Sequence, residues 1–356
     1  MGRDGGECMT TIKLNVIDQP KTDYKGGTST LCPGCGHDQI TSCIIEACWQ
    51  NGIKPQSIAK MSGIGCSSKT PAYFLSNSHG FNTVHGRMPS VTTGASVVNP
   101  ELVALGISGD GDTASIGIGQ FLHAIRRNLD MVYIVANNGV YGLTKGQHSA
   151  TTEKGSQKKK GPANVMPPID LCALALQLNG TFVARAFSGS KKSLTSLIRA
   201  ALSHRGFALI DVISPCVTFN NNEGSTRSYQ YVKQHEAELH TLGYIPPSPA
   251  PEQVEIPPGE FRDIELHDGS VLRLEALDDD HDTNDPTTAL SILHNAAAEG
   301  RHVTGLLHHR SNEETLIESL GLTNTSLVDL SDEMMRPPKA KLDEMLADLR
   351  KRPDVE

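Results

Sequence analysis

The sequence predicts an α/β fold in which a parallel sheet is flanked by helices. Short apolar runs alternate with helical stretches between residues 29 and 225, and several of these runs are apolar throughout. Fully apolar strands are typical of a sheet buried on both faces, and their alternation with helices is typical of parallel connections. A single short run could also be buried helix, so the prediction depends on the whole series.

The expected elements divide the chain into three parts. An arm over 1–28 ends in a Gly-rich turn, a domain covers 29–225, and a C-terminal arm over 226–356 packs on its own core or on a partner subunit. The third part begins with a Pro-rich linker, followed by a small hairpin around an HDG turn and an acidic tract. Strands are expected over 102–107, 131–136, 182–186 and 207–213, and helices over 116–127, 191–204, 286–299 and 339–351.

Composition is that of an ordinary globular protein, with 38% hydrophobic and 20% charged residues among 356. No run of about 20 apolar residues is present, so we expect no membrane span. The start has no apolar signal core, and we expect a cytoplasmic protein. The net charge of -8 argues against nucleic acid as a partner. The basic run 158–160 is read as a solvated loop in preference to a docking patch.

The strongest signal lies between Gly109 and Val140, where one expected strand ends at GDGD and the next at Asn137–Asn138. Ligands bind at the carboxyl edge of a parallel sheet, where these two strand ends meet. The glycines let the backbone approach a diphosphate, and the next helix presents its positive end. Asp110 and Asn138 can give oxygens to Mg²⁺, and the carbonyl of Val140 could complete the set.

Either half of this pattern alone would be an ordinary turn. Twenty-five residues separate the GDG from the Asn pair, which suits one helix plus one strand, and the joint pattern favours a ligand site. The segment resembles the thiamine-diphosphate motif, in which an Asp, an Asn and a carbonyl hold Mg²⁺. By that resemblance thiamine diphosphate is the cofactor, and Asp110, Asn138 and Val140 are the magnesium ligands.

The eight cysteines fall into two groups. Those in helix-like stretches are read as buried structural thiols, and Cys8 lies in the N-terminal arm; the helical ones are Cys43, Cys48 and Cys172. The others stand in turn-like segments with Gly or Pro, and they are Cys32, Cys35, Cys66 and Cys216. A C-x-x-C pair is typical of zinc, of a redox disulfide or of an iron–sulfur cluster, and spacing alone leaves zinc open.

Six ordered motifs carry a more specific resemblance, namely CPGCGH, GIGCSSK, HGRMPSVTTGAS, GDGD, NNGVYGLTKGQ and SPC. Over about residues 29 to 225 they resemble the β subunit of the 2-oxoacid:ferredoxin oxidoreductases. The resemblance implies a thiamine-diphosphate-binding fold with a C-terminal arm, and oxidative decarboxylation of a 2-oxo acid that is reversible in principle. Coenzyme A would accept the acyl group and ferredoxin the electrons. It also implies one [4Fe–4S] cluster held by Cys32, Cys35, Cys66 and Cys216.

Further site residues carry over by motif. The implied cofactor-binding set is Ile64, Gly65, Cys66, Ser67, His85, Gly109, Asp110, Gly111, Asp112, Asn138, Val140 and Tyr141. His37 is expected just behind this set, and His85 has the alternative of a satisfied turn histidine. Lys69 and Lys145 would bind the substrate carboxylate, unless they are solvated loop lysines, and Leu143 would line the substrate pocket. YGLTKGQ resembles members that accept 2-oxoglutarate or a broad range of oxo acids and differs from the YSNTGGQ of pyruvate-specific members. This points toward 2-oxoglutarate, with a pyruvate or broad-range enzyme as the alternative.

A thiamine enzyme also needs a glutamate opposite the aminopyrimidine, normally from a second domain. Only one GDG-type domain is visible, so we expect an α subunit to supply that residue in an αβ or α₂β₂ assembly. No C-x₂-C-x₂-C-x₃-C run is found, and electrons are expected to leave for an external carrier. Two other classes stay open: a non-redox thiamine-dependent decarboxylase or synthase, and a zinc-stabilised binding subunit.

Overall fold

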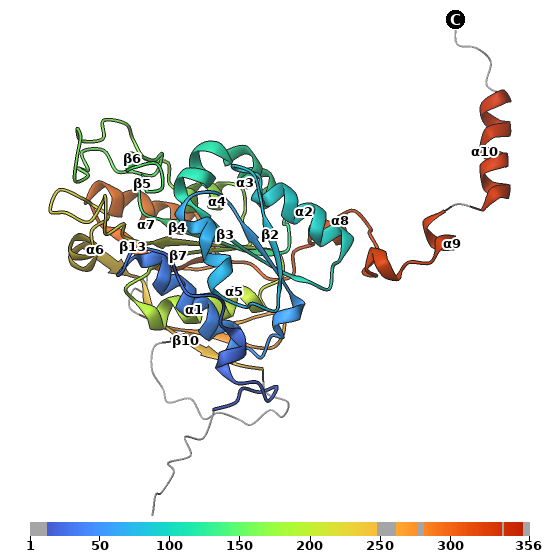
Figure 1. Ribbon diagram of the computed structural model, residues 1–356, viewed down its shortest axis with the longest axis horizontal. Coiled ribbons are helices and arrows are strands. Elements are labelled where there is room, and N and C mark those ends of the chain that lie inside the picture. The colour runs from blue at the N-terminus through green and yellow to red at the C-terminus, as the bar shows by residue number, and fades with distance from the viewer. Residues whose placement is uncertain (1–12, 248–260, 277–280, 337, 352–356) are drawn as a thin grey trace, which may run out of the picture.

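An eight-stranded sheet forms the centre of the computed structural model, which describes residues 13–247, 261–276, 281–336 and 338–351 (Figure 1). The strand order is β2-β1-β3-β4-β8-β7-β13-β9, and neighbours run parallel except that β13 is antiparallel to β7. The strands are β1 (Ile58–Ser62), β2 (His79–Asn82), β3 (Val103–Gly109), β4 (Met131–Asn137), β7 (Phe182–Phe187), β8 (Phe207–Ile213), β9 (Glu236–Glu238) and β13 (His302–His309).

Helices cover both faces of this sheet, which explains why its central strands are apolar throughout. In β4, Val132 and Ile134 belong to a core shared with one helical layer, whereas Tyr133 and Val135 belong to the core of the other. The first layer contains α1 (Gly36–Gln50) and α5 (Lys191–Ser203); the second contains α2 (Met88–Val98), α3 (Ile118–Arg126), α4 (Leu171–Gln177) and α7 (Pro286–Ala298). The predicted parallel sheet flanked by helices is confirmed.

The four expected strands lie within two residues of their predicted bounds. The helix expected over 116–127 is shorter than predicted, because the segment after the GDG forms a wider π turn, η4 (Gly111–Ile116), before α3 begins. The Gly117 amide donates to the Asp112 carbonyl at 2.8 Å, which closes this turn. A π turn has no distinct apolar period, and the sequence pattern therefore could not separate it from α3.

The sequence predicts an arm after residue 226. In the structure, much of this part of the chain forms strands of the protein body. Strands β9 and β13 complete the main sheet, and an antiparallel sheet of order β10-β12-β11 contains the predicted hairpin. Leu242, Leu272 and Leu274 of this second sheet share a core with α5. Strand β13 reads HVTGLLHH, and its buried histidines hide the strand pattern in the sequence. The second sheet comprises β10 (His240–Ile245), β11 (Phe261–Glu265) and β12 (Val271–Ala276).

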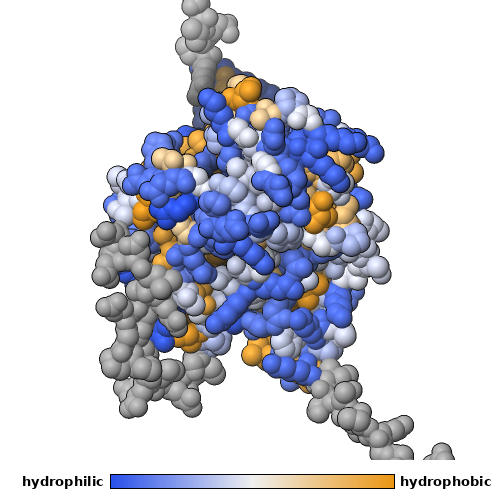
Figure 2. Space-filling model, turned by 90° about the vertical axis from the view of Figure 1, so that its left-hand side faces the viewer, coloured by the Kyte–Doolittle hydropathy of each residue, from blue (hydrophilic) through white to orange (hydrophobic). Residues whose placement is uncertain are grey.

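Beyond about residue 320 the chain leaves the body, as the red segment of Figure 1 shows. No residue of η5, α9 or α10 is buried. The face seen in Figure 2 is mainly hydrophilic, with hydrophobic residues in small separate groups. The remaining elements are η1 (Lys21–Tyr24), η2 (Pro55–Ser57), η3 (Cys66–Tyr73), β5 (Val140–Tyr141), β6 (Gln147–His148), α6 (Tyr229–His235), α8 (Leu316–Ser319), η5 (Leu327–Asp329), α9 (Asp332–Met335) and α10 (Lys339–Lys351).

The expectations that fall partly or wholly outside the described residues are residues 1–12 of the N-terminal arm, with Cys8, residues 248–260 of the Pro-rich linker, and residues 277–280 of the acidic tract. Across the described ranges, no helix combines the length and apolar character needed to cross a membrane.

Candidate active site

A cavity of about 300 Å³ opens at the carboxyl ends of β1, β3 and β4, the edge where parallel sheets bind ligands. Segments that are far apart in the sequence meet there because their strands are neighbours. Leu143 of the expected substrate pocket also lines the cavity. The full expected cofactor-binding set lies around it: Ile64, Gly65, Cys66, Ser67, His85, Gly109, Asp110, Gly111, Asp112, Asn138, Val140 and Tyr141.

One wall of the cavity is built largely from backbone. A side chain at Gly111 would overlap the ring of Tyr141, which packs directly over this glycine. Any Cβ at Gly109 would come within 3.2 Å of the Ser67 hydroxyl. Ser67 is only 1% exposed, yet its hydroxyl has no hydrogen-bond partner among the described residues. A buried unpartnered hydroxyl is costly, and a phosphate oxygen beside Gly109 would satisfy it. This wall therefore fits a diphosphate.

Asp110 stands at the carboxyl end of β3, 1% exposed, with both oxygens engaged. Oδ2 accepts hydrogen bonds from the hydroxyls of Ser149 and Thr151, the latter at 2.8 Å. Oδ1 accepts one backbone N–H, from Asn138 at 3.2 Å. Burial raises the pKa of the Asp110 carboxyl group above its usual value, and the hydrogen bonds from Ser149 and Thr151 offset only part of that rise. A cation at Oδ1 would favour the ionised form, so the donor set fits Mg²⁺.

Asn138 and Val140 form a tight turn directly after β4. The Asn138 side-chain oxygen accepts the Val140 amide at 3.0 Å, and the Asn138 carbonyl accepts the Asn220 amide at 2.8 Å. Both residues are buried and line the cavity. The amide oxygen of Asn138 and a carboxylate oxygen of Asp110 thus lie on the same cavity wall, as the sequence predicted, and their role as magnesium ligands remains a proposal.

Asp112 also lines the cavity, but its carboxylate is occupied by the protein itself. Oδ1 accepts the Gly86 amide at 2.7 Å and Oδ2 accepts the Ser108 hydroxyl at 2.8 Å. Gly63 packs so closely against Oδ2 that a side chain there would overlap it. Asp112 therefore joins three segments around the cavity. This structural role is enough to explain the presence of Asp112 in the motif without a cofactor contact.

The four turn cysteines meet beside this cavity. Cys35 caps the start of α1, Cys66 begins η3, and Cys216 follows β8. A side chain at Gly142 would lie 3.5 Å from the sulfur of Cys66 and 3.7 Å from that of Cys216. Thr218 donates to the sulfur of Cys32 at 3.3 Å, and the Gly36 amide donates to the Pro215 carbonyl at 3.4 Å, which joins the two cysteine turns.

The mutual influence of these thiols shows how near they lie. Burial, with smaller contributions from the neighbouring Cys216 and Cys32, raises the pKa of Cys35 to about 12. Burial and Cys216 likewise raise the pKa of Cys66, whereas Lys69 lowers it. Among the described residues, no three Cys, His, Asp or Glu side chains are arranged to hold a single metal ion. An iron–sulfur cube binds each thiolate through a different iron, so its ligands do not have to converge on one point.

His37 lies behind the cysteines, as expected, and also reaches the cavity lining. It is 2% exposed, and its Nδ1 is 2.8 Å from the Ser214 hydroxyl. Burial lowers the pKa of His37 to about 4, so the ring is neutral at neutral pH. His85 is exposed at the rim of the same cavity. The structure thus places one neutral and one solvent-facing imidazole at the site.

The expected substrate residues are only partly brought together. Leu143 lines the cavity and is 54% exposed, which places it at the mouth. Lys69 and Lys145 are both exposed and are not among the lining residues. Lys145 adopts a positive φ of 81° in the loop between β5 and β6. Both lysines are close in sequence to residues that line the cavity, but their own side chains do not line it in this chain.

Several polar residues near Asp110 were not found from the sequence. Ser149 and Thr151 bond its carboxylate, and Asn137 was recognised only as half of the Asn-Asn pair. Behind them, Asp211 lies within β8 and Arg227 lies in a loop, and neither belongs to a motif. No local sequence pattern marks these positions, because each of them contacts Asp110 or its partners from a segment that is distant in the sequence.

Comparison with known protein families agrees with this geometry. Residues 63–212 match the family described as thiamine pyrophosphate enzyme, C-terminal TPP binding domain. This range includes the whole segment from Gly109 to Val140. The fold and site therefore define a thiamine-diphosphate-binding domain of the thiamine pyrophosphate enzymes.

Relatives found by sequence similarity indicate which family of thiamine pyrophosphate enzymes the chain belongs to. The chain is 34% identical over 240 residues to 2-oxoglutarate synthase subunit KorB of Methanocaldococcus jannaschii, covering 66% of this chain and 87% of the relative. It is 44% identical over 191 residues to 2-oxoacid:ferredoxin oxidoreductase subunit beta of a Sulfolobus species, covering 53% of this chain. That match spans 63% of the Sulfolobus protein, less than two thirds of its length. The chain belongs to the family of 2-oxoacid:ferredoxin oxidoreductase β subunits.

A solved structure shares most of the architecture. It is the 2-oxoglutarate:ferredoxin oxidoreductase from Magnetococcus marinus with 2-oxoglutarate, coenzyme A and succinyl-CoA bound. The similarity has a TM-score of 0.68 at 29% sequence identity and covers 94% of this chain and 97% of that one. The described fold is thus that of a family member nearly from end to end.

Proposed function

We propose that the chain is the β subunit of an enzyme that oxidatively decarboxylates a 2-oxo acid, preferably 2-oxoglutarate. One oxo acid and one coenzyme A yield an acyl-CoA, CO₂ and a proton, while two electrons pass singly to two oxidised ferredoxins. For 2-oxoglutarate the product is succinyl-CoA. The observation that carries the proposal is the meeting of the Asp110–Asn138 wall and the thiol group around Gly142 at a single cavity.

When bound, thiamine diphosphate supplies the carbon nucleophile that releases CO₂ from the oxo acid, and a [4Fe–4S] cluster accepts the electrons one at a time. Asp110, Asn138 and the Val140 carbonyl would hold Mg²⁺. The Ser67 hydroxyl would donate to the diphosphate beside Gly109. The ligands of the cluster would be Cys32, Cys35, Cys66 and Cys216.

The surroundings of the thiols support electron transfer to an external carrier. Cys32 is exposed, whereas Cys35 is buried and the other two are half-buried. One corner of the thiol group therefore faces solvent, where a ferredoxin can approach.

The preference for 2-oxoglutarate is supported by Leu143 at the cavity mouth and by the relatives named as 2-oxoglutarate enzymes. Lys69 and Lys145 are solvent-exposed near the site and would attract an anionic substrate. Because Leu143 and His85 are exposed at the mouth, the cavity opens on the protein surface. An α subunit would close it there and supply the missing glutamate, in an αβ or α₂β₂ assembly.

The alternatives explain less of the site. A single structural zinc needs four ligands around one ion, whereas the described thiols are not arranged around one point. A non-redox thiamine enzyme would use the Asp110–Asn138 wall and leave the neighbouring cysteines without a role.

The test uses the chain in complex with the subunit that copurifies with it, isolated without oxygen. Reduction of ferredoxin should require coenzyme A and should show the highest kcat/KM with 2-oxoglutarate among 2-oxoglutarate, pyruvate and branched-chain oxo acids. A higher value with pyruvate would overturn the substrate assignment. No reduction with any oxo acid would overturn the function itself.

A matched cysteine pair tests the thiol group. Cys66→Ser should abolish ferredoxin reduction and lower the iron content, whereas Cys43→Ser, a buried thiol of α1 away from the cavity, should leave both nearly unchanged. Unchanged electron transfer in the Cys66 variant would refute the cluster assignment.

A further inference from the structure

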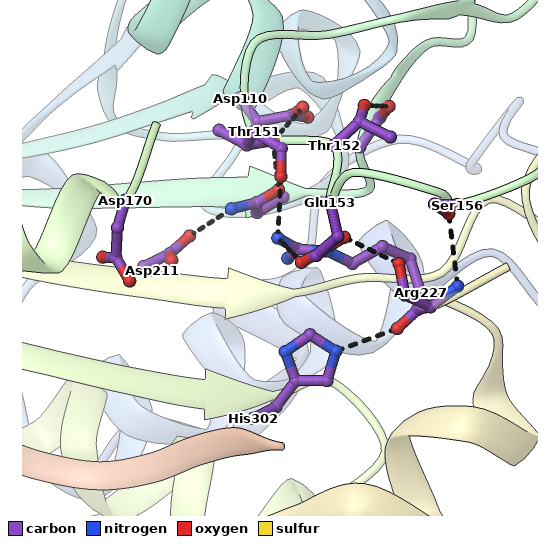
Figure 3. Close-up of polar contacts among 12 residues, drawn as sticks. Asp110, Thr151, Thr152, Glu153, Ser156, Asp170, Asp211, Arg227 and His302 are labelled. Carbon is purple, nitrogen blue, oxygen red and sulfur yellow. Dashed lines mark hydrogen bonds and ion pairs between the residues drawn. The ribbon is translucent and has the colours of Figure 1, made fainter. Parts of the chain in front are cut away.

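The carboxylate of Asp110 is supported from behind by a group of buried polar residues, shown in Figure 3. Thr151 lies next to Asp110, is 1% exposed, and does not line the cofactor cavity. It lines a second cavity of about 380 Å³, together with Asn137, Asp211 and Arg227. Asp110 thus separates the first cavity from a polar layer that the proposed reaction does not use.

Two hydroxyls determine how the Asp110 carboxylate is turned. Both Ser149 and Thr151 donate to Oδ2, and their own oxygens are 3.2 Å apart. Oδ1 receives only the Asn138 amide, at 3.2 Å. The hydroxyls of Ser149 and Thr151 both approach Oδ2, although the single proton of Thr151 is shared with Asn137. Oδ2 is therefore the more engaged oxygen, and Oδ1 is the oxygen left to bind a cation.

The Thr151 hydroxyl is itself held between two acceptors. It lies 2.8 Å from Asp110 Oδ2 and 2.9 Å from the side-chain oxygen of Asn137. The Asn137 amide nitrogen donates to Asp211 at 2.8 Å, so the oxygen of Asn137 must face Thr151. Asp211 in turn accepts from Arg185 at 3.1 Å, and Arg185 also pairs with Asp170. This chain of contacts fixes the position of the hydroxyl relative to the sheet.

The loop that carries Thr151 is anchored by an ion pair between the buried Arg227 and the half-buried Glu153. Arg227 donates to the Thr151 carbonyl at 3.1 Å and pairs with Glu153, two residues further on, at 2.6 Å. Thr226 also donates to Glu153, at 2.7 Å. The guanidinium group of Arg227 is therefore already paired inside the protein. This pairing suits Arg227 to holding the loop in place more than to binding a ligand in the second cavity.

We propose that Thr151 is a positioning residue for the cofactor site: its hydroxyl, with that of Ser149, holds Oδ2 of Asp110 so that Oδ1 presents to the cation. Residues that orient a metal ligand commonly change metal affinity by roughly 10- to 100-fold when removed. The inference rests on the proposed Mg²⁺–thiamine diphosphate site and goes beyond it by naming the residue that prepares the site.

The test compares substitutions of the same shape at two buried threonines. Thr151→Val removes the hydroxyl at constant size, and Thr151→Ser keeps a hydroxyl. Thr92→Val removes a hydroxyl from α2 that donates to the Met88 carbonyl and to no other group in the described part of the chain. Each variant is purified in the complex that the chain forms, freed of cofactor, and titrated calorimetrically with thiamine diphosphate at a series of Mg²⁺ concentrations. Melting temperature without Mg²⁺ is recorded in parallel.

Thr151→Val should raise the Mg²⁺ concentration for half-maximal cofactor binding at least about 10-fold, and Thr151→Ser and Thr92→Val should stay within about threefold of the wild type. Equal impairment of the Val and Ser variants, or a Thr151→Val variant with normal Mg²⁺ dependence, would overturn the inference. So would a loss of melting temperature without any change in the Mg²⁺ requirement. Asp110→Ala separates the two proposals, because unchanged Mg²⁺ dependence in that variant would reject the cation site itself.

Discussion

The two sides of Asp110 are built in different ways. On the cavity side the residues come from short motifs at strand ends, such as GDG and Asn-Asn. On the supporting side, Thr151 lies 41 positions after Asp110, and Asp211 lies 74 positions after its partner Asn137. Positions that touch a cofactor are restricted by backbone geometry, whereas supporting contacts can be made by many polar residues from many loops. Only the first side therefore leaves a recognisable pattern.

Replacement of Asp110 should have the largest effect of the changes considered. It should weaken cofactor binding more than it lowers the stability of the fold. Asp110→Ala takes away the one carboxylate proposed for Mg²⁺, and we expect more than roughly 100-fold weaker Mg²⁺-dependent binding of thiamine diphosphate. Asp112→Asn is the comparison, because the Asp112 oxygens are occupied by Gly86 and Ser108. Calorimetry should show a smaller change for Asp112→Asn; the reverse order would exchange the roles of the two carboxylates.

On the supporting side, breaking the ion pair should cost folding stability. Arg227→Met leaves the half-buried Glu153 carboxylate without its cation, and the cost should lie between that of a surface pair, below about 1 kcal/mol, and the about 3–5 kcal/mol of a fully buried pair. The same change at Arg301 removes an exposed pair with Glu299 and should cost below about 1 kcal/mol. The free energy of unfolding in urea measures both. Equal costs would mean that the Arg227 pair is no better shielded from water than a surface pair.

Acid should destabilise the supporting side through the buried His302, whose Nε2 lies 2.9 Å from the Thr226 carbonyl. Burial, and after it the nearby Arg227, lowers the pKa of His302 to about 4, while an unfolded histidine has a pKa of about 6.5. Between these values the unfolded chain takes up a proton that the folded chain does not, so stability is lost as pH falls. The loss for one such histidine is about 2 kcal/mol at pH 5.

His302→Gln should reduce this pH dependence, whereas His123→Gln, at an exposed position of α3, should not. Urea unfolding at pH 7.5 and at pH 5 provides the comparison. The same slope in the wild type and in His302→Gln would show that other groups cause the acid sensitivity.

The smallest effect on stability is expected at the C-terminal end. Deleting the residues after Met335 removes α10, which has no buried residue, and should change the free energy of unfolding by less than about 0.5 kcal/mol. Leu316→Ala, in the buried start of α8, should cost about 2 kcal/mol or more. A large loss on deletion would show that the end of the chain packs on the body in solution.

The sequence predicted the sheet, the cavity wall and the structural cysteines because each has a short-range signature. Cys43, Cys48 and Cys172 are buried, as their helical context indicated. The π turn after the GDG and strand β13 were missed, because neither has the expected apolar period. Thr151 could not be found, because its role arises from loops that meet only in the folded protein.

The most direct test of the account is the cofactor content of the chain purified without oxygen in its natural complex. We expect about four irons and one thiamine diphosphate per chain, together with Mg²⁺ and no zinc. A colourless protein that contains zinc and releases no thiamine diphosphate on denaturation would contradict the account.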